Sequence, residues 1–198
     1  MTRGFSRSGD AYLVEFDADE AQAVALVVAQ VAGLIQAESR TVRAAEAPGA
    51  PAGSPAVDPT TEPSGPASPE DPALVRLFPD GYRDDAESAA ELRRLTQPSL
   101  RDMKVANAST VLDDLPLEGG EVRLDDEGAE AWLLAINDAR LVLGTRLDLT
   151  DDTDLTAELD EAVAADPTSP RVMAISVYHY LSFLQETLIE AMDPADDR

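Results

Sequence analysis

Hydrophobic and polar residues alternate over two short stretches of the chain and follow a helical spacing over most of the rest. The alternation at 5–16, interrupted by a turn around Gly9, predicts a β-hairpin. A second alternating stretch at 121–124 is expected to pair with this hairpin and to complete a small three-stranded sheet. The expected fold class is therefore mainly α, a helical bundle with a small N-terminal β-hairpin or three-stranded β element.

The helical periodicity divides the remaining chain into separate amphipathic segments. Asp17 and Glu20 form a capping-box pattern at the beginning of the first segment. Pro98 is expected to end one later helix and separate it from the next. The segment after Asp125 is apolar on nearly every side, which predicts a helix at the centre of the bundle. The predicted helices lie at about 18–45, 70–78, 84–96, 99–115, 125–144, 156–165 and 170–192.

Residues 48–69 follow neither pattern, because they consist almost entirely of Pro, Gly, Ala, Ser and Thr. Val57 is the only large apolar residue in this stretch, so it cannot bury enough surface to offset the entropy of ordering it. We expect a flexible insert within a single helical domain that spans 1–193, followed by a disordered tail at 194–198.

The chain is strongly acidic: its 198 residues include 39 acids and 15 bases, which gives a formal charge of -24. A nucleic-acid backbone attracts clustered Lys and Arg and is repelled by such an excess of carboxylates. The charge therefore favours a protein partner with a basic surface over nucleic acid. Adaptation to high salt, or solubility in general, explains the same charge equally well.

The amino-acid composition and the absence of known motifs exclude several kinds of chemistry. The chain has no cysteine, which excludes disulfides, zinc–thiolate sites and thiol redox switches. It has no nucleotide-binding motif, metalloprotease motif or nucleophile elbow, so we expect no enzyme activity and no cofactor. The first ten residues lack the apolar core of a signal peptide, and the apolar run at 21–35 is predicted to be too short to span a bilayer. We therefore expect a cytoplasmic protein with no membrane contact.

Two polar features resemble parts of catalytic or metal sites. His179 is the only histidine, and a general base would need an orienting acid and a nucleophile beside it. A packed histidine with a local hydrogen bond is the favoured interpretation. The acids at 148–154 lack both the spacing and the glycine of a calcium-binding loop, so helix capping and a solvated charge run explain them better.

Three segments stand out together by their order and spacing: LFPDGYRDD at 77–85, WLLAINDAR at 132–140 with LGTRL at 143–147, and YHYLSFLQETL at 178–188. Together they resemble the actinobacterial AosR-type oxidative-stress regulator family, long catalogued as a domain of unknown function. The likeness covers most of the chain except 48–69 and the tail.

The resemblance implies a cytosolic regulator of transcription under oxidative stress that acts with a sigma factor of RNA polymerase. It also implies redox sensing through paired cysteines, and this sequence has none, so thiol sensing is not expected here. Association with the transcription machinery does not depend on those cysteines and remains the expected function. A homodimer is a further possibility.

Four basic residues, Arg93, Arg94, Arg101 and Lys104, lie on either side of the expected break at Pro98. A helix, a short break and a second helix over 84–115 have the outline of a helix-turn-helix, although neighbouring acids favour ion pairing within and between helices. We predict that these four residues contact a protein partner. The alternatives are a direct DNA-binding regulator that uses the 84–115 helix pair, and an enzyme with an unrecognised carboxylate or metal site.

Overall fold

The computed structural model describes residues 3–46, 71–82, 85–150 and 152–193. These residues form six α-helices and one three-stranded antiparallel sheet, which confirms the mainly α fold class. The insert predicted at 48–69 and the tail predicted at 194–198 lie outside the described residues.

The sheet has the strand order β1-β2-β3. β1 (Arg3–Ser8) and β2 (Ala11–Phe16) form the predicted hairpin, and β3 (Gly120–Leu124) pairs with the free edge of β2. In the turn, Gly9 has a φ of 62°, a left-handed conformation that glycine adopts without strain. The alternating pattern therefore predicted all three strands correctly.

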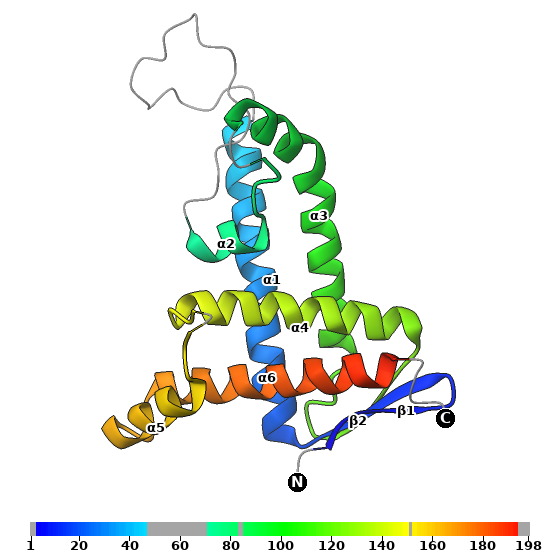
Figure 1. Cartoon of the computed structure of the whole chain (residues 1–198). Helices are drawn as coiled ribbons and strands as arrows, with labels where there is room; N and C mark the ends of the chain where they lie inside the picture. Colours follow the sequence, from blue (N-terminus) through cyan, green and yellow to red (C-terminus); the bar gives the residue numbers. More distant parts are fainter. Residues whose placement is uncertain (1–2, 47–70, 83–84, 151, 194–198) are drawn as a thin grey trace, which may run out of the picture.

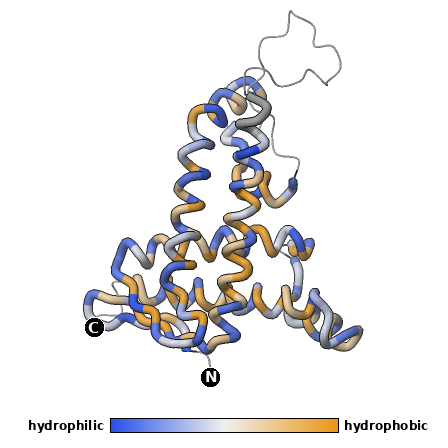
Figure 2. The backbone as a smooth tube through the Cα atoms, turned by 180° about the vertical axis from the view of Figure 1, so that it is seen from behind, coloured by the Kyte–Doolittle hydropathy of each residue, from blue (hydrophilic) through white to orange (hydrophobic). Residues whose placement is uncertain are grey.

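α1 (Ala18–Glu46) begins with the predicted capping box. The amide N–H of Glu20 donates to Asp17 Oδ1 at 2.8 Å, and the amide N–H of Asp17 donates to Glu20 Oε2 at 2.9 Å. These two bonds satisfy backbone donors that the first helical turn leaves without partners. The hydrophobic residues that follow run along most of the helix (Figure 2).

The same helix corrects one prediction about membranes. The stretch Ala18–Thr41 has 24 residues and is long and apolar enough to cross a bilayer, so the expectation that it is too short is wrong. The core helix of a folded domain passes the same test. Here Val24 and Ile35 are buried, and α1 packs against α3, α4 and α6.

α3 (Ala86–Asp114) is one continuous helix of 29 residues, which corrects the predicted break at Pro98. A proline inside a helix removes one backbone hydrogen bond and bends the axis, and Figure 1 shows the first turns of α3 tilted away from the rest. Around the proline, the side chain of Gln97 is buried, and α3 packs against α1. The two helices predicted on either side of the proline are therefore a single bent element.

α4 (Asp126–Arg146) and α6 (Pro170–Met192) run antiparallel and form a layer across α1 (Figure 1). α4 packs against α1, α2, α3 and α6, which confirms its predicted central place. It continues through Gly144, where it was predicted to end. A Cβ added at this glycine would lie 3.4 Å from the Tyr178 ring of α6, an ordinary contact distance. The two short helices, α2 (Pro72–Leu77) and α5 (Leu155–Ala165), pack on α4 and α6 respectively.

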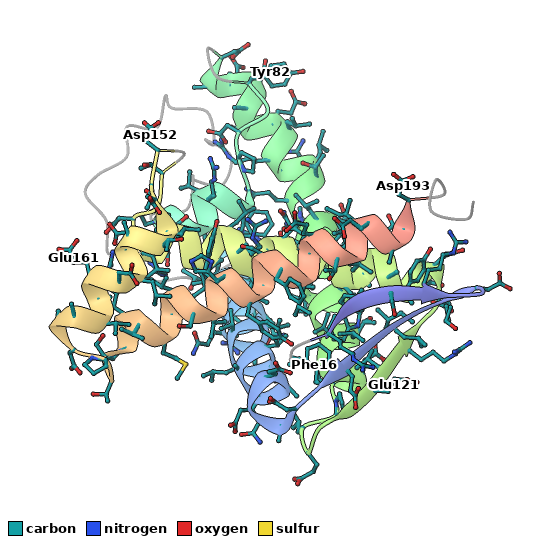
Figure 3. All side chains as sticks on the ribbon, turned by 60° about the horizontal axis from the view of Figure 1, so that its bottom comes forward. Phe16, Tyr82, Glu121, Asp152, Glu161 and Asp193 are labelled. Carbon is teal, nitrogen blue, oxygen red and sulfur yellow. The ribbon has the colours of Figure 1, made fainter. Side chains whose placement is uncertain are left out.

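Trp132 lies at the centre of the main core with 0% exposure, as predicted. The ring of Phe5 meets the indole edge-on with centroids 5.7 Å apart, and the ring of Phe16 lies 5.9 Å away. The indole N–H donates to Asp114 Oδ2 at 2.9 Å, so the polar atom of this buried side chain is also satisfied. Figure 3 shows Phe16 at the end of β2, where the sheet meets the beginning of α1.

The first strand packs directly on the last helix. The amide N–H of Phe5 donates to Thr187 Oγ1 at 3.0 Å, a bond between residues 182 positions apart. Gly4 lies against the same side chain, and a Cβ at position 4 would come within 2.4–2.7 Å of three Thr187 atoms. The absence of a side chain at Gly4 therefore lets β1 lie against α6.

Candidate protein-binding site

Of the four cations predicted to contact a partner, two point toward the protein interior. Arg101 is 7% exposed, and its Nη2 lies 3.8 Å from Glu38 Oε1 on α1. The Nζ of Lys104 lies 2.6 Å from Asp138 Oδ1 on α4. Both cations also lie over the ring of Phe78, at 5.4 Å and 5.8 Å from its centroid. These side chains therefore join α3 to α1, to α4 and to the end of α2.

The other two cations lie nearer the beginning of α3. Arg93 forms an ion pair with Asp80, which ties the helix to the turn before it. Arg94 is exposed and forms no ion pair with any described residue. The partner contact of the four residues stays a prediction, and Arg94 is the member whose side chain is free to make one.

The shape of α3 does not support the alternative of direct DNA binding through residues 84–115. A helix-turn-helix needs a turn that sets the second helix across the first, and α3 has none. Arg93, Arg101 and Lys104 are each paired with a carboxylate, and phosphate binding depends on cations that are free to meet the backbone.

A different surface is the stronger candidate. A groove of about 810 Å³ lies between α3, the first half of α4 and the sheet, and we call it the α3–α4 groove. Its lining is acidic, since five carboxylates face a single cation, Arg123. The five acids are Asp10, Asp114, Asp125, Glu127 and Glu130.

The same groove contains an apolar surface and a spare hydrogen-bond donor. Met103 of α3 and Leu134 of α4 both line it and are 45% and 38% exposed, although each is a large hydrophobic residue. Asn107 also lines it, and the Nδ2 of this side chain is buried with no hydrogen-bond partner among the described residues. A buried donor without an acceptor costs about 1–3 kcal/mol, so this groove residue carries a local penalty.

The groove was not predicted from the sequence, although a signal for it was present. Met103, Asn107, Thr110 and Asp114 follow one another at helical spacing and share one face of α3. The sequence had instead suggested the four basic residues around Pro98 as the contact with a protein partner, with DNA recognition by 84–115 as an alternative. The prediction that α4 is buried on nearly every side also concealed the groove, because Leu134 is in fact exposed.

The two polar features that resembled catalytic or metal sites stand apart from this groove. The Nε2 of His179 is buried and has no hydrogen-bond partner in the described part of the chain, which differs from the predicted local bond. Asp154 caps α5 by accepting from the amide N–H groups of Thr156 and Ala157, as the capping interpretation predicted. Among the described residues, no group of three or more His, Asp or Glu side chains is placed to hold a metal ion.

A protein-family model matches residues 2–192 of the chain. The chain belongs to the DUF2017 family, a domain of unknown function. This confirms the resemblance found in the three sequence segments. Two of the segments lie on α4 and α6 of this DUF2017 fold, and the first contains Phe78, which lies beneath the cations of α3. No solved structure matches the chain.

Curated relatives of this DUF2017 chain come from mycobacteria. Proteins named oxidative stress regulator AosR from Mycobacterium bovis and Mycobacterium tuberculosis are each 35% identical to it over 134 residues, 61% of this chain. A relative from Mycobacterium leprae is 36% identical over 137 residues, 63% of this chain. The chain matches 58–59% of the length of these curated relatives.

Proposed function

We propose that this DUF2017 chain is a cytoplasmic regulatory protein of the oxidative-stress response, and that it binds a protein of the transcription machinery in the α3–α4 groove. The names of its mycobacterial relatives support a regulator rather than an enzyme. The observation that carries the binding mode is the groove itself, where five acids surround the exposed side chains of Met103 and Leu134.

The chemistry of the groove defines the kind of segment that fits it. An amphipathic helix lays its apolar side chains into a groove, while its charged side chains reach the rim. Apolar residues of the partner would pack on Met103 and Leu134, and its Lys or Arg side chains would meet the carboxylates. The partner segment, on a sigma factor or on RNA polymerase, is therefore a basic amphipathic helix.

Charge reversal in the groove tests this proposal. Glu127 and Glu130 are exposed groove residues whose carboxylates accept no hydrogen bond from other described residues, so Glu127→Lys with Glu130→Lys should leave the fold intact. Binding to purified sigma factors and core RNA polymerase, measured by biolayer interferometry, should weaken by at least about tenfold, because like charges then face each other across the interface.

A matched control separates the groove from the overall charge. Asp160→Lys with Glu161→Lys makes the same change in net charge on α5, where both acids are exposed and lie outside the groove. This control should lower the association rate only modestly and leave the dissociation rate unchanged. Equal loss of affinity in the two double variants, or unchanged affinity in the groove variant, would contradict binding in the groove.

A further inference from the structure

A second pocket lies on another part of the molecule, between α2, α4, α6 and the loop that follows α4. Its volume is about 630 Å³, and we call it the α4–α6 pocket. Arg140, Gly144 and Tyr178 line it, and all three belong to the sequence segments that carry the family resemblance. The groove proposed for the protein partner shares no lining residue with this pocket.

Arg140 is a half-buried cation whose partners are all neutral. Its Nε donates to Ser182 Oγ at 3.0 Å, Nη1 donates to Gln185 Oε1, and Nη2 donates to the Tyr178 hydroxyl oxygen at 3.5 Å. Its guanidinium also lies 5.3 Å from the centroid of the Tyr178 ring. A guanidinium carries two N–H groups on each terminal nitrogen and stays charged in proteins. One N–H on Nη1 and one on Nη2 therefore remain available.

The lack of a carboxylate sets Arg140 apart. Among the described residues, the Arg and Lys side chains that are buried or half-buried are Arg93, Arg101, Lys104 and Arg140. The first three each form an ion pair, and Arg140 forms none. A charge withdrawn from water is costly unless an opposite charge compensates it. In a chain with 39 acids, the missing counter-charge at this position is consistent with an anion that comes from outside.

The rest of the lining defines the class of anion. Arg76 of α2 brings a second cation and forms no ion pair with any described residue, while Asp148 is the one carboxylate of the lining. Leu141 and Leu149 add an apolar wall beside the Tyr178 ring. Two arginines suit the paired oxygens of a carboxylate or phosphate, and the apolar wall suits a small organic body attached to it.

We infer that the α4–α6 pocket binds a small organic oxyanion, a carboxylate or a phosphate ester. Its anionic group meets Arg140 and Arg76, and its apolar body lies on Leu141 and Leu149. The Tyr178 hydroxyl accepts from Arg140, so its own proton can be donated to the same anion. This ligand site is independent of the protein-binding proposal, and either can fail alone.

Isothermal titration calorimetry of the full chain at constant ionic strength tests the site with three probes: benzoate, phenyl phosphate and sodium sulfate. Benzoate or phenyl phosphate should bind saturably at one site with a Kd below about 1 mM. The ratio of their affinities tells whether the pocket prefers a carboxylate or a phosphate. Sulfate should bind more weakly, because it has no apolar body. Saturation by neither aromatic probe up to about 10 mM, or sulfate binding as tightly as both, would overturn the assignment.

Two charge-reversal variants make the test specific. Arg76→Glu removes one cation and places a carboxylate beside Arg140, so the affinity should fall by at least about tenfold. Arg94→Glu makes the same change of charge at an exposed residue outside the pocket, and it should change affinity by less than about twofold. Both arginines are exposed and unpaired among the described residues, so both variants should fold. An equal loss in the two variants would show a general charge effect and would overturn the site. Arg140→Gln should abolish binding where circular dichroism shows that it folds.

Discussion

At the scale of single residues, the contact between Gly4 and Thr187 makes the sharpest prediction. A Cβ at position 4 would lie within 2.4–2.7 Å of Thr187 atoms, closer than carbon atoms can approach without a shift of the strand. Gly4→Ala should therefore lower the free energy of unfolding by about 1–3 kcal/mol, the usual effect of forcing a methyl group into a packed site. Urea unfolding followed by circular dichroism measures this.

Gly33 provides the matched control. It is an exposed residue inside α1, and a Cβ added there would have no neighbour within 4 Å. Gly33→Ala should raise the free energy of unfolding by about 0.5–1 kcal/mol, because alanine loses less backbone entropy than glycine in a helix. If Gly4→Ala also raised the free energy of unfolding, the effect at Gly4 would come from chain entropy and not from its contact with Thr187.

The residue scale also shows what the sequence can and cannot predict. The capping box of Asp17 and Glu20 was predictable because both partners lie within one helical turn. The burial of Trp132 followed from the apolar run around it. The Gly4–Thr187 contact depends on two elements at opposite ends of the chain, and local pattern carries no information about how closely they approach.

At the scale of elements, α3 is held to α4 by a buried ion pair between Lys104 and Asp138. Asp138 is 4% exposed, and burial raises the pKa of its carboxyl, although the hydrogen bond and charge of Lys104 lower it. Lys104→Met would leave this carboxylate buried without its cation, so it should lower the free energy of unfolding by about 3–5 kcal/mol at pH 7. Adding Asp138→Leu to this variant should recover most of the loss, because no buried charge then remains.

The pH dependence of Lys104→Met identifies the cause. A carboxyl with a raised pKa in the folded state holds its proton more tightly there than in the unfolded chain. Its contribution is therefore most favourable below the ordinary carboxylate pKa and declines as pH rises through the raised value. The difference in free energy of unfolding between the wild type and Lys104→Met should be smaller near pH 4 than at pH 7. A deficit independent of pH would point to lost packing of the lysine stem instead.

α3 also shows why one element was predicted wrongly. Proline inside a helix usually marks an end, and Gln97 before it supports that interpretation. In the folded protein the helix continues past Pro98 with a bend, while its side chains bind α1, the residue after α2, and α4. Tertiary contacts therefore outweigh a local breaking signal. The α3–α4 groove was hidden for a different reason: all of its α3 residues, from Met103 to Asp114, follow the proline, but the groove forms only where this part of α3 lies beside α4 and the sheet.

At the scale of the whole molecule, the formal charge of -24 should make stability depend on salt. Carboxylates that repel one another in the compact state are screened when the Debye length falls from about 30 Å at 0.01 M to about 8 Å at 0.15 M salt. Raising sodium chloride over that range should therefore increase the free energy of unfolding by about 1 kcal/mol, or Tm by about 2–4 °C.

A neutralising variant checks the origin of this effect. Asp160→Asn with Glu161→Gln changes the formal charge from -24 to -22 at exposed positions of α5, and it should reduce the salt effect. A Tm that falls with salt would mean that ion pairs such as Arg146 with Asp71 and Arg171 with Glu158 outweigh the overall repulsion. Exposed pairs of this kind are each worth about 0–1 kcal/mol, which is why repulsion is expected to dominate.

The packing of β1 against α6 affects how the protein folds while it is being synthesised in the cell. Phe5 cannot complete its hydrogen bond to Thr187 until α6 has left the ribosome. Until then, the side of β1 that packs against α6 stays uncovered on the nascent chain. Such surfaces are where chaperones bind and where aggregation begins. Closure of the fold around β1 is thus delayed until α6 has been synthesised and covers the strand.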